Sequence, residues 1–283
     1  MNSDNLLVVN PKRVEKIRAN LIYGGKDNLH VLSDFDKTLT RAFVDGQKAH
    51  TVIAQVRQGN YLTSDYSSRA HQLFEKYHPI EIDRKISPEE KKKKMHEWWK
   101  IHFELLVECG LDKKTISEIV SKRTLKFREG CFEFLDLLYK NKIPLVVMSA
   151  AMGDMISEYL KQENKMYSNI KLIANFYDWD KKGKAVKVRE PIIHSVNKDE
   201  LIIKDFPEIF KVVSKRKNVI LLGDSLEDPD MITGFDSDNI LKIGFLNENV
   251  SENLPYFKEK YDVLILNDGN MDYVNKLMGE IIK

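Results

Sequence analysis

Four short apolar runs that each end in polar residues constrain the fold of this chain more than any other feature. The runs are HVLSDFD at 30–36, PLVVMSAA at 144–151, NVILLGDS at 218–225 and DVLILND at 262–268. Continuous apolar runs of this length are typical of strands that are buried on both faces of a sheet. Helical patterns alternate with them, at 129–142, 153–163 and 271–282. The alternation predicts an α/β fold with a doubly wound parallel sheet.

A segment of about eighty residues, 45–124, interrupts this alternation. It carries almost no β-branched apolar run but several helix-like stretches, the longest from Pro88 to Cys109. Ser87 is placed to cap that helix, with Glu90 three residues later as in a capping box, and Gly110 is placed to stop it. Apolar side chains recur within it at helical spacing and should pack inside the insert: Met95, Trp98, Trp99, Phe103 and Leu106.

These patterns divide the chain into two expected domains. Residues 1–44 and 125–283 form the core, and residues 45–124 form an inserted α-helical cap. The chain crosses between them through short hinges, which we expect near 43–48 and 122–127.

Charge and cysteine content exclude several functional classes. The 45 Lys and Arg residues against 43 Asp and Glu give a net charge of +2, so there is no broad attraction for nucleic acid or anionic lipid. The run EEKKKK at 89–94 is typical of a solvated helix face. No apolar stretch is long enough to span a membrane, and the first residues lack a secretory signal pattern. Two cysteines, Cys109 and Cys131, are expected to be buried free thiols of a cytoplasmic protein.

Two of the strand ends carry pairs of aspartates. Asp34 and Asp36 follow the first run, and their i,i+2 spacing directs both side chains to one side. Asp224 and Asp228 follow the run at 218–225. Open α/β sheets bind ligands at the carboxyl edge of their strands, so the four carboxylates should meet there. Hard oxygen ligands with open positions suit Mg²⁺, whereas Ca²⁺ requires a fuller protein cage.

Two further residues complete a site for phosphoryl chemistry. The hydroxyl of Ser149 and the backbone N–H groups that follow it are placed to hold a phosphate oxygen, and Lys198 supplies a positive charge. A carboxylate nucleophile can attack phosphorus and divide one difficult displacement into two easier ones. Any one of these residues alone would more often be a turn or cap residue. Their occurrence together at successive strand ends favours a catalytic site.

The motifs resemble those of the haloacid dehalogenase-like phosphohydrolases, whose first motif DxDxT reads DFDKT here. The similarity is closer to the cytosolic type III, or pyrimidine, 5′-nucleotidases, through segments that run from about residue 30 to the C-terminus: SDFDKTLT, PIEID, EEKKKKMHEWW, VVMSAAMGD, NKDE, VILLGDS and ILKIGFLN. The resemblance implies a Rossmann-like core with a helical cap, and Mg²⁺-dependent hydrolysis of nucleoside 5′-monophosphates such as CMP and UMP through an aspartyl-phosphate intermediate. Whether the enzyme also transfers the phosphoryl group to a nucleoside acceptor, as a side reaction, stays open.

The resemblance also assigns roles to residues of the core. Asp34 is the nucleophile, and Asp36 acts first as acid and then as base. Ser149 and the Ala150 backbone bind phosphate, with Lys198 steadying the charge. Mg²⁺ is held by Asp34, the main-chain carbonyl of Asp36 and Asp224. Asp228 either binds the ion directly or contacts one of the groups that bind it.

In the cap, Glu81 matches the position that contacts the nucleobase. An ionised carboxylate accepts from cytosine N4 but repels uracil O4, so CMP should be favoured over UMP. Pairing of Glu81 within the insert is the alternative. Two positions depart from the family pattern: His102 replaces a serine used in base binding, and Glu227 replaces a glycine near the metal. Whether the base is a pyrimidine or 7-methylguanine stays open.

Other functions remain as alternatives at this stage. The same mechanism could serve another small phosphate ester, because cap inserts change specificity more readily than chemistry. A nucleotide-binding module without turnover, or a glycosyltransferase with DFD as its metal-binding pair, fits fewer of the motifs. No histidine is assigned to catalysis, and the aromatic candidates for stacking on a base are better explained as core residues: Phe43, Tyr66, Trp98 and Trp99. We expect a small-molecule substrate, no nucleic acid or membrane partner, and a monomer or weak dimer.

Overall fold

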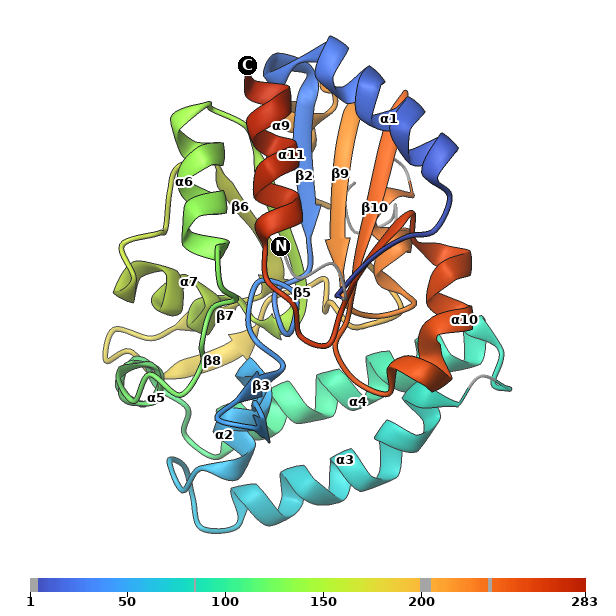
Figure 1. The fold of residues 1–283 in the computed structure, drawn as a ribbon. Coiled ribbons are helices and arrows are strands. Elements are labelled where there is room, and N and C mark those ends of the chain that lie inside the picture. The colour runs from blue at the N-terminus through green and yellow to red at the C-terminus, as the bar shows by residue number, and fades with distance from the viewer. Residues whose placement is uncertain (1–4, 84, 199–204, 234–235) are drawn as a thin grey trace.

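A central sheet with helices on both faces forms the core of the computed structural model, which describes residues 5–83, 85–198, 205–233 and 236–283 (Figure 1). Within those ranges the sheet has seven strands. In spatial order they are β1 (Leu6–Val8), β11 (Val263–Leu266), β10 (Asn239–Leu246), β9 (Asn218–Gly223), β2 (Leu29–Ser33), β5 (Leu145–Met152) and β6 (Ile170–Asn175). All neighbours pair in parallel except β1, which is antiparallel to β11.

The central strands are mostly apolar because both faces of the sheet are covered. In β2, Val31 belongs to one buried apolar cluster and Leu32 to the cluster on the opposite face. Successive side chains of a strand point to opposite faces, so a strand covered on both sides has no polar face. The first face is covered by α1 (Pro11–Gly24), α6 (Cys131–Lys140), α7 (Gly153–Gln162) and α11 (Asp272–Ile282), and the second by α9 (Pro207–Val213), η3 (Asp228–Ile232) and α10 (Val250–Lys260).

Figure 1 places the helices of the insert beyond the carboxyl ends of the parallel strands. They are α2 (Val52–Gln58), α3 (Tyr66–Ile82), α4 (Pro88–Glu108) and α5 (Lys113–Ser121). Two short hairpins flank them: β3 (Phe43–Val44) with β4 (Gln47–Lys48), and β7 (Tyr177–Trp179) with β8 (Ala185–Val188). The short 3-10 turn η2 (Lys26–Asn28) leads into β2.

The expected α/β fold and its parallel core are confirmed. The long helix begins as predicted, because the hydroxyl of Ser87 accepts a hydrogen bond from Glu90 N at 3.2 Å. Gly110 follows its end with a φ of +84°, a left-handed conformation that favours glycine. Cys109 and Cys131 are buried free thiols. The small hairpins were not anticipated, since two- to four-residue strands carry too little periodicity to stand out.

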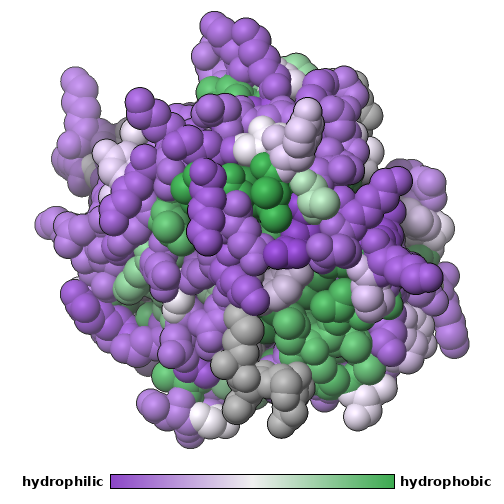
Figure 2. All heavy atoms as spheres, turned by 45° about the horizontal axis from the view of Figure 1, so that its top comes forward, coloured by the Kyte–Doolittle hydropathy of each residue, from purple (hydrophilic) through white to green (hydrophobic). Residues whose placement is uncertain are grey.

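No helix among the described residues is long and apolar enough to cross a membrane. Figure 2 shows hydrophilic residues over most of the face that it displays, with apolar groups in smaller areas between them. This surface agrees with the 31% charged residues of the sequence.

Candidate active site

The predicted acidic site forms where β2 and β9 end side by side. The two strands pair in parallel, and the backbone N–H of Asp34 donates to the carbonyl of Leu222 at 3.0 Å. One oxygen from each carboxylate of Asp34, Asp224 and Asp228 lies within 4.8 Å of the others. The convergence of two strand ends from distant parts of the sequence is what the parallel topology requires.

Lys198 joins this cluster from a loop that follows the β7–β8 hairpin. Its ammonium group lies 2.5 Å from Asp34 Oδ1 and 3.0 Å from Asp228 Oδ1, and the lysine is buried. The other oxygen of Asp228 accepts hydrogen bonds from the backbone N–H groups of Asp224 and Ser225, each at 3.0 Å. The Asp228 carboxylate therefore has contacts at both oxygens, whereas Asp34 and Asp224 each have one oxygen without a side-chain or backbone partner among the contacts described.

Burial and mutual repulsion govern the charges of the cluster. Burial, opposed by the charge of Lys198 and reinforced by Asp228, raises the pKa of Asp34 to about 7. Burial together with the charges of Asp34 and Asp228 raises the pKa of Asp224 well above its usual value. Burial alone would lower the pKa of Lys198, but the two aspartates outweigh it and raise that pKa. The site thus concentrates negative charge that a further cation would stabilise.

These features fit a divalent cation. The donor set consists of hard carboxylate oxygens, three of them close together, against one ammonium group that contacts two of the carboxylates. Such a set suits Mg²⁺, which binds one or two carboxylates and fills its other positions with water and substrate phosphate. Asp34 and Asp224 would hold the ion, with Asp228 next to it.

Asp36 stands apart from the three clustered carboxylates. Its Oδ1 accepts a hydrogen bond from the backbone N–H of Val52 at 2.9 Å, at the start of α2. Burial, opposed by that hydrogen bond, raises the pKa of Asp36 to about 6. The two aspartates of the DFD motif therefore have different surroundings, one beside a lysine and the other beside a helix N-terminus.

The strand end of β5 carries the predicted phosphate-binding residues. Ser149 is buried, and its Oγ accepts a hydrogen bond from the backbone N–H of Ala151 at 3.1 Å. The side-chain amide of Asn175, at the end of β6, donates to the carbonyls of Ala150 and Ile193 at 2.8 Å each. Asn175 thereby ties the last residues of β5 to the loop that carries Lys198.

Glu81 lies at the last turn of α3 and reaches from the insert to the core. Its Oε1 accepts a hydrogen bond from the hydroxyl of Ser195 at 2.8 Å, and its Oε2 lies 3.2 Å from His78 Nδ1. Ser195 is three residues before Lys198. Glu81, the predicted base-contacting residue, therefore contacts the same loop that carries Lys198.

His102 lies inside the insert and contacts other insert residues. It is buried, and its Nε2 lies 3.1 Å from the hydroxyl of Tyr66. Tyr66, Trp98 and Trp99 are also buried, as expected for core residues, while Phe43 is half-buried in β3. Burial, and then the charge of Arg57, lowers the pKa of His102 to about 3.

This buried histidine makes stability depend on pH. Between about pH 6.5 and pH 3 the unfolded chain binds a proton at His102 that the folded protein does not bind, so stability is lost as the pH falls through that range. We expect His102→Gln to reduce the loss of unfolding free energy between pH 7 and pH 5 by about 2 kcal/mol. Urea denaturation of both proteins at the two pH values measures it, and equal losses in both would contradict the assignment.

Two residues near the site were not anticipated from the sequence. The hydroxyl of Thr38 donates to Asp224 Oδ1 at 3.3 Å, and Asn175 makes the loop contacts described above. Thr38 is the last residue of the DFDKT motif, so the motif itself could have identified it. Asn175 offered none, because a single asparagine after an apolar run is an ordinary turn residue.

Comparison with known proteins identifies similar chains along the whole length. The sequence model of the family described as Pyrimidine 5′-nucleotidase (UMPH-1) matches residues 37–282. The 7-methylguanosine phosphate-specific 5′-nucleotidase A of Xenopus laevis is 33% identical over 98% of this chain and 96% of its own length. The 7-methylguanosine phosphate-specific 5′-nucleotidase of Homo sapiens is 34% identical over 98% of this chain and 92% of its own.

Solved structures agree with this similarity. The crystal structure of cytosolic 5′-nucleotidase IIIB bound to cytidine has a TM-score of 0.91 at 30% identity, covering 99% of this chain and 94% of that chain. A phosphoserine phosphatase, solved as a phospho-aspartyl intermediate analogue, has a TM-score of 0.52 at 17% identity and covers 88% of this chain and 97% of its own. This second likeness concerns the fold alone.

Proposed function

The chain belongs to the pyrimidine 5′-nucleotidase family and is a phosphomonoester hydrolase of the haloacid dehalogenase-like type, and from this premise we propose that it is a Mg²⁺-dependent enzyme that hydrolyses nucleoside 5′-monophosphates through an aspartyl phosphate. The observation that carries the proposal is the clustering of Asp34, Asp224 and Asp228 at the carboxyl edge of the sheet, with Lys198 in contact with Asp34 and Asp228. The match to a nucleotidase family argues against the alternatives of a binding module and a glycosyltransferase.

In the first half of the proposed reaction, a carboxylate oxygen of Asp34 attacks phosphorus while the bond from phosphorus to the 5′-oxygen breaks. The leaving 5′-oxygen takes a proton from Asp36, whose pKa of about 6 leaves a share of it protonated near neutral pH. In the second half, Asp36 accepts a proton from water as the water oxygen attacks the phosphorus of the aspartyl phosphate. Asp34 is then free, and inorganic phosphate leaves.

The other residues hold the phosphoryl group in place. Ser149 and the backbone of Ala150 bind its oxygens, and Lys198 neutralises part of their charge. Asp34, the main-chain carbonyl of Asp36 and Asp224 would hold a divalent ion, which would supply the remaining positive charge beside the phosphate. Positioning and charge stabilisation are the main contributions that a protein makes to phosphoryl transfer.

The insert is proposed to form a cap, residues 45–124, that recognises the base. Its aromatic cluster contains buried N–H groups that have no partner among the described residues: Trp98 Nε1, Trp99 Nε1 and Arg57 Nε. Unpaired buried donors are costly, so they support a polar ligand in this region. Glu81 and His102 are the residues that we propose to face or border the base.

Glu81 gives a testable basis for selectivity. Its carboxylate can accept from cytosine N4 but repels uracil O4, so kcat/KM should be higher for CMP than for UMP. We expect Glu81→Gln, which can also donate, to reduce the CMP to UMP ratio of kcat/KM by about 10-fold. Steady-state kinetics with the two nucleotides measures the ratio. An unchanged ratio would show that Glu81 only pairs with Ser195 and His78.

A second substrate, 7-methylguanosine monophosphate, is favoured by the names of the similar proteins from Xenopus laevis and Homo sapiens. Guanine also presents an amino group, N2, that a carboxylate can accept from. Phosphate release from a panel of CMP, UMP, 7-methylguanosine monophosphate and non-nucleotide esters distinguishes the candidates. Release only from the non-nucleotide esters would contradict the proposal.

The proposed setting follows from the same relatives. One is named as a putative cytosolic 5′-nucleotidase of Caenorhabditis elegans, 31% identical over 99% of this chain. We propose a cytoplasmic enzyme that acts as a monomer or weak dimer, with phosphoryl transfer to a nucleoside as a side reaction, because a sugar hydroxyl can replace water in the second step.

A further inference from the structure

A buried arginine lies where the chain returns from the insert to the core. The side chain of Arg128 is 1% exposed. Its backbone N–H donates to the carbonyl of Leu39 at 2.9 Å, and Arg41 N donates to the carbonyl of Lys126 at 2.8 Å. The outgoing and returning segments of the chain therefore run side by side at this point.

The guanidinium group of Arg128 ties several segments together. It donates to the carbonyls of Lys37, Thr38, Thr40 and Gly269, to Asn247 Oδ1 and to the carboxylate of Asp268; the bonds to Thr38 and Asp268 measure 2.8 and 3.1 Å. Three of its acceptors are carbonyls of the four residues that follow Asp36. A planar group with five N–H donors can hold them together, whereas lysine has three donors on one atom.

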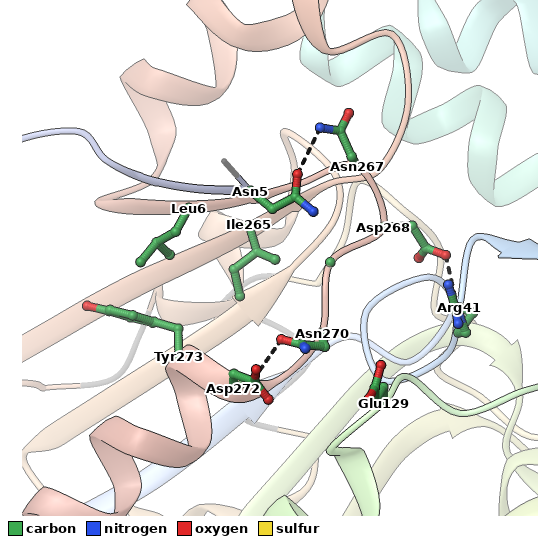
Figure 3. A pocket seen from close by; sticks show the side chains of 11 residues that line it. Asn5, Leu6, Arg41, Glu129, Ile265, Asn267, Asp268, Asn270, Asp272 and Tyr273 are labelled. Atoms are coloured by element: carbon green, nitrogen blue, oxygen red, sulfur yellow. Dashed lines mark hydrogen bonds and ion pairs between the residues drawn. The ribbon is translucent and has the colours of Figure 1, made fainter. Parts of the chain in front are cut away.

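Asp268 extends the same contacts to the start of the insert. Its carboxylate accepts from the backbone N–H groups of Ala42 and Phe43 at 2.9 and 3.2 Å. Figure 3 shows Asp268 also pointing to Arg41, which contacts it from the surface at 3.2 Å with 43% of its side chain exposed. We name Arg128 and Asp268, with the backbone groups of 37–43 that they bind, the hinge clamp.

Figure 3 also shows the pocket of about 710 Å³ beside Asp268. It is lined by residues of mixed charge, including Glu129, Asp272 and Arg41, and lies among residues other than the catalytic carboxylates. We assign no ligand to it. Two of its lining residues, Asp268 and Gly269, also accept hydrogen bonds from Arg128.

The hinge clamp is linked to Asp36 through the chain and to Asp224 through the side chain of Thr38. Lys37, whose carbonyl the clamp binds, directly follows Asp36 and has a φ of +60°, a conformation that is strained for a non-glycine residue. The carbonyl of Thr38 is held by Arg128 while its hydroxyl contacts Asp224. The backbone that directly follows Asp36 is thus held by Arg128, and the Asp36 side chain is held by the N–H of Val52.

We propose that Arg128 and Asp268 are positioning residues that hold Asp36 in the orientation needed for proton transfer to the leaving oxygen. This inference rests on the proposed acid role of Asp36. Neither residue touches the reacting atoms, so both act through the backbone of 37–43. A displacement of about 1 Å in a catalytic group can cost about 100-fold in rate.

Leaving-group dependence tests this role. The 5′-oxygen of CMP needs a proton as it departs, whereas the p-nitrophenolate of p-nitrophenyl phosphate departs without one. We expect Arg128→Lys to reduce kcat for CMP by about 30-fold or more, and kcat for p-nitrophenyl phosphate by less than about 3-fold. Asp268→Asn should show the same pattern at about 5-fold for CMP, and it decides the matter if Arg128→Lys does not fold.

Two further variants complete the design. Arg41→Gln removes the exposed partner of the same Asp268 carboxylate and should leave both rates within about 2-fold of wild type. Asp36→Asn is the reference for a lost acid and should show the strongest leaving-group dependence. If Asp36→Asn shows it but the clamp variants lower both rates equally or neither, the clamp is merely structural and the inference is wrong. If Asp36→Asn itself shows none, the acid role fails, and with it the inference.

Discussion

Asp34→Asn is expected to lower kcat for nucleoside monophosphates by about 10³-fold or more, because an amide oxygen cannot form the covalent bond to phosphorus on which both steps depend. Steady-state phosphate release measures the loss. The exposed Asp45→Asn, in the turn of the β3–β4 hairpin, is the matched control and should retain wild-type kinetics. Residual turnover of Asp34→Asn above a few per cent of wild type would exclude Asp34 as the nucleophile.

The same substitution should leave the fold intact. Lys198 keeps its contact with Asp228 when Asp34 loses its charge, and the repulsion between Asp34 and Asp224 disappears. In metal-free buffer we therefore expect Asp34→Asn to have an unfolding free energy equal to or above that of the wild type. Urea denaturation distinguishes this loss of chemistry from a loss of structure, and a clear destabilisation would mean that Asp34 has a structural role instead.

Removal of divalent metal is the second large effect. We expect dialysis against EDTA to lower kcat by about 100-fold or more, and added Mg²⁺ to restore it, because the clustered carboxylates repel an anionic substrate unless a cation offsets them. Asp224→Asn should raise the Mg²⁺ concentration needed for half-maximal activity by about 10-fold or more. Titration of Mg²⁺ into the metal-free proteins measures both.

The control for the metal experiment lies two residues beyond Asp228. Asp230 is exposed on η3, and Asp230→Asn should leave the Mg²⁺ dependence unchanged. Activity that survives EDTA in the wild type, or an equal shift in Asp224→Asn and Asp230→Asn, would contradict a metal held by this cluster.

Much of the core could be predicted because its signals are local. The apolar runs predicted β2, β5, β9 and β11, since strands covered on both faces are built mostly from apolar residues. β10 and β6 are harder to find: β10 contains Lys242 and Asn239, and polar residues at partly exposed positions break the run. The β7–β8 hairpin and the placement of β1 at the sheet edge depend on tertiary contacts that no short pattern contains.

The candidate site divides in the same way. Asp34 and Asp224 follow the ends of the paired strands β2 and β9, so the parallel topology alone predicts that they meet. Asp36, Ser149 and Lys198 were identified from the motifs that contain them. Arg128 and Asn175 act through backbone carbonyls, which any sequence supplies, so nothing in the sequence identifies their partners. The contact of Glu81 with Ser195 likewise depends on how α3 lies over the core, which helical periodicity does not specify.

The most direct test of the central claim is to stop a single turnover of the Mg²⁺-loaded protein with CMP by acid and to map the phosphoryl group by mass spectrometry of its peptides. The account predicts one phosphoryl group on the peptide that contains Asp34, labile to hydroxylamine and absent from Asp34→Asn. A phosphoryl group on another residue, or turnover with no phosphorylated peptide at any quench time, would contradict it.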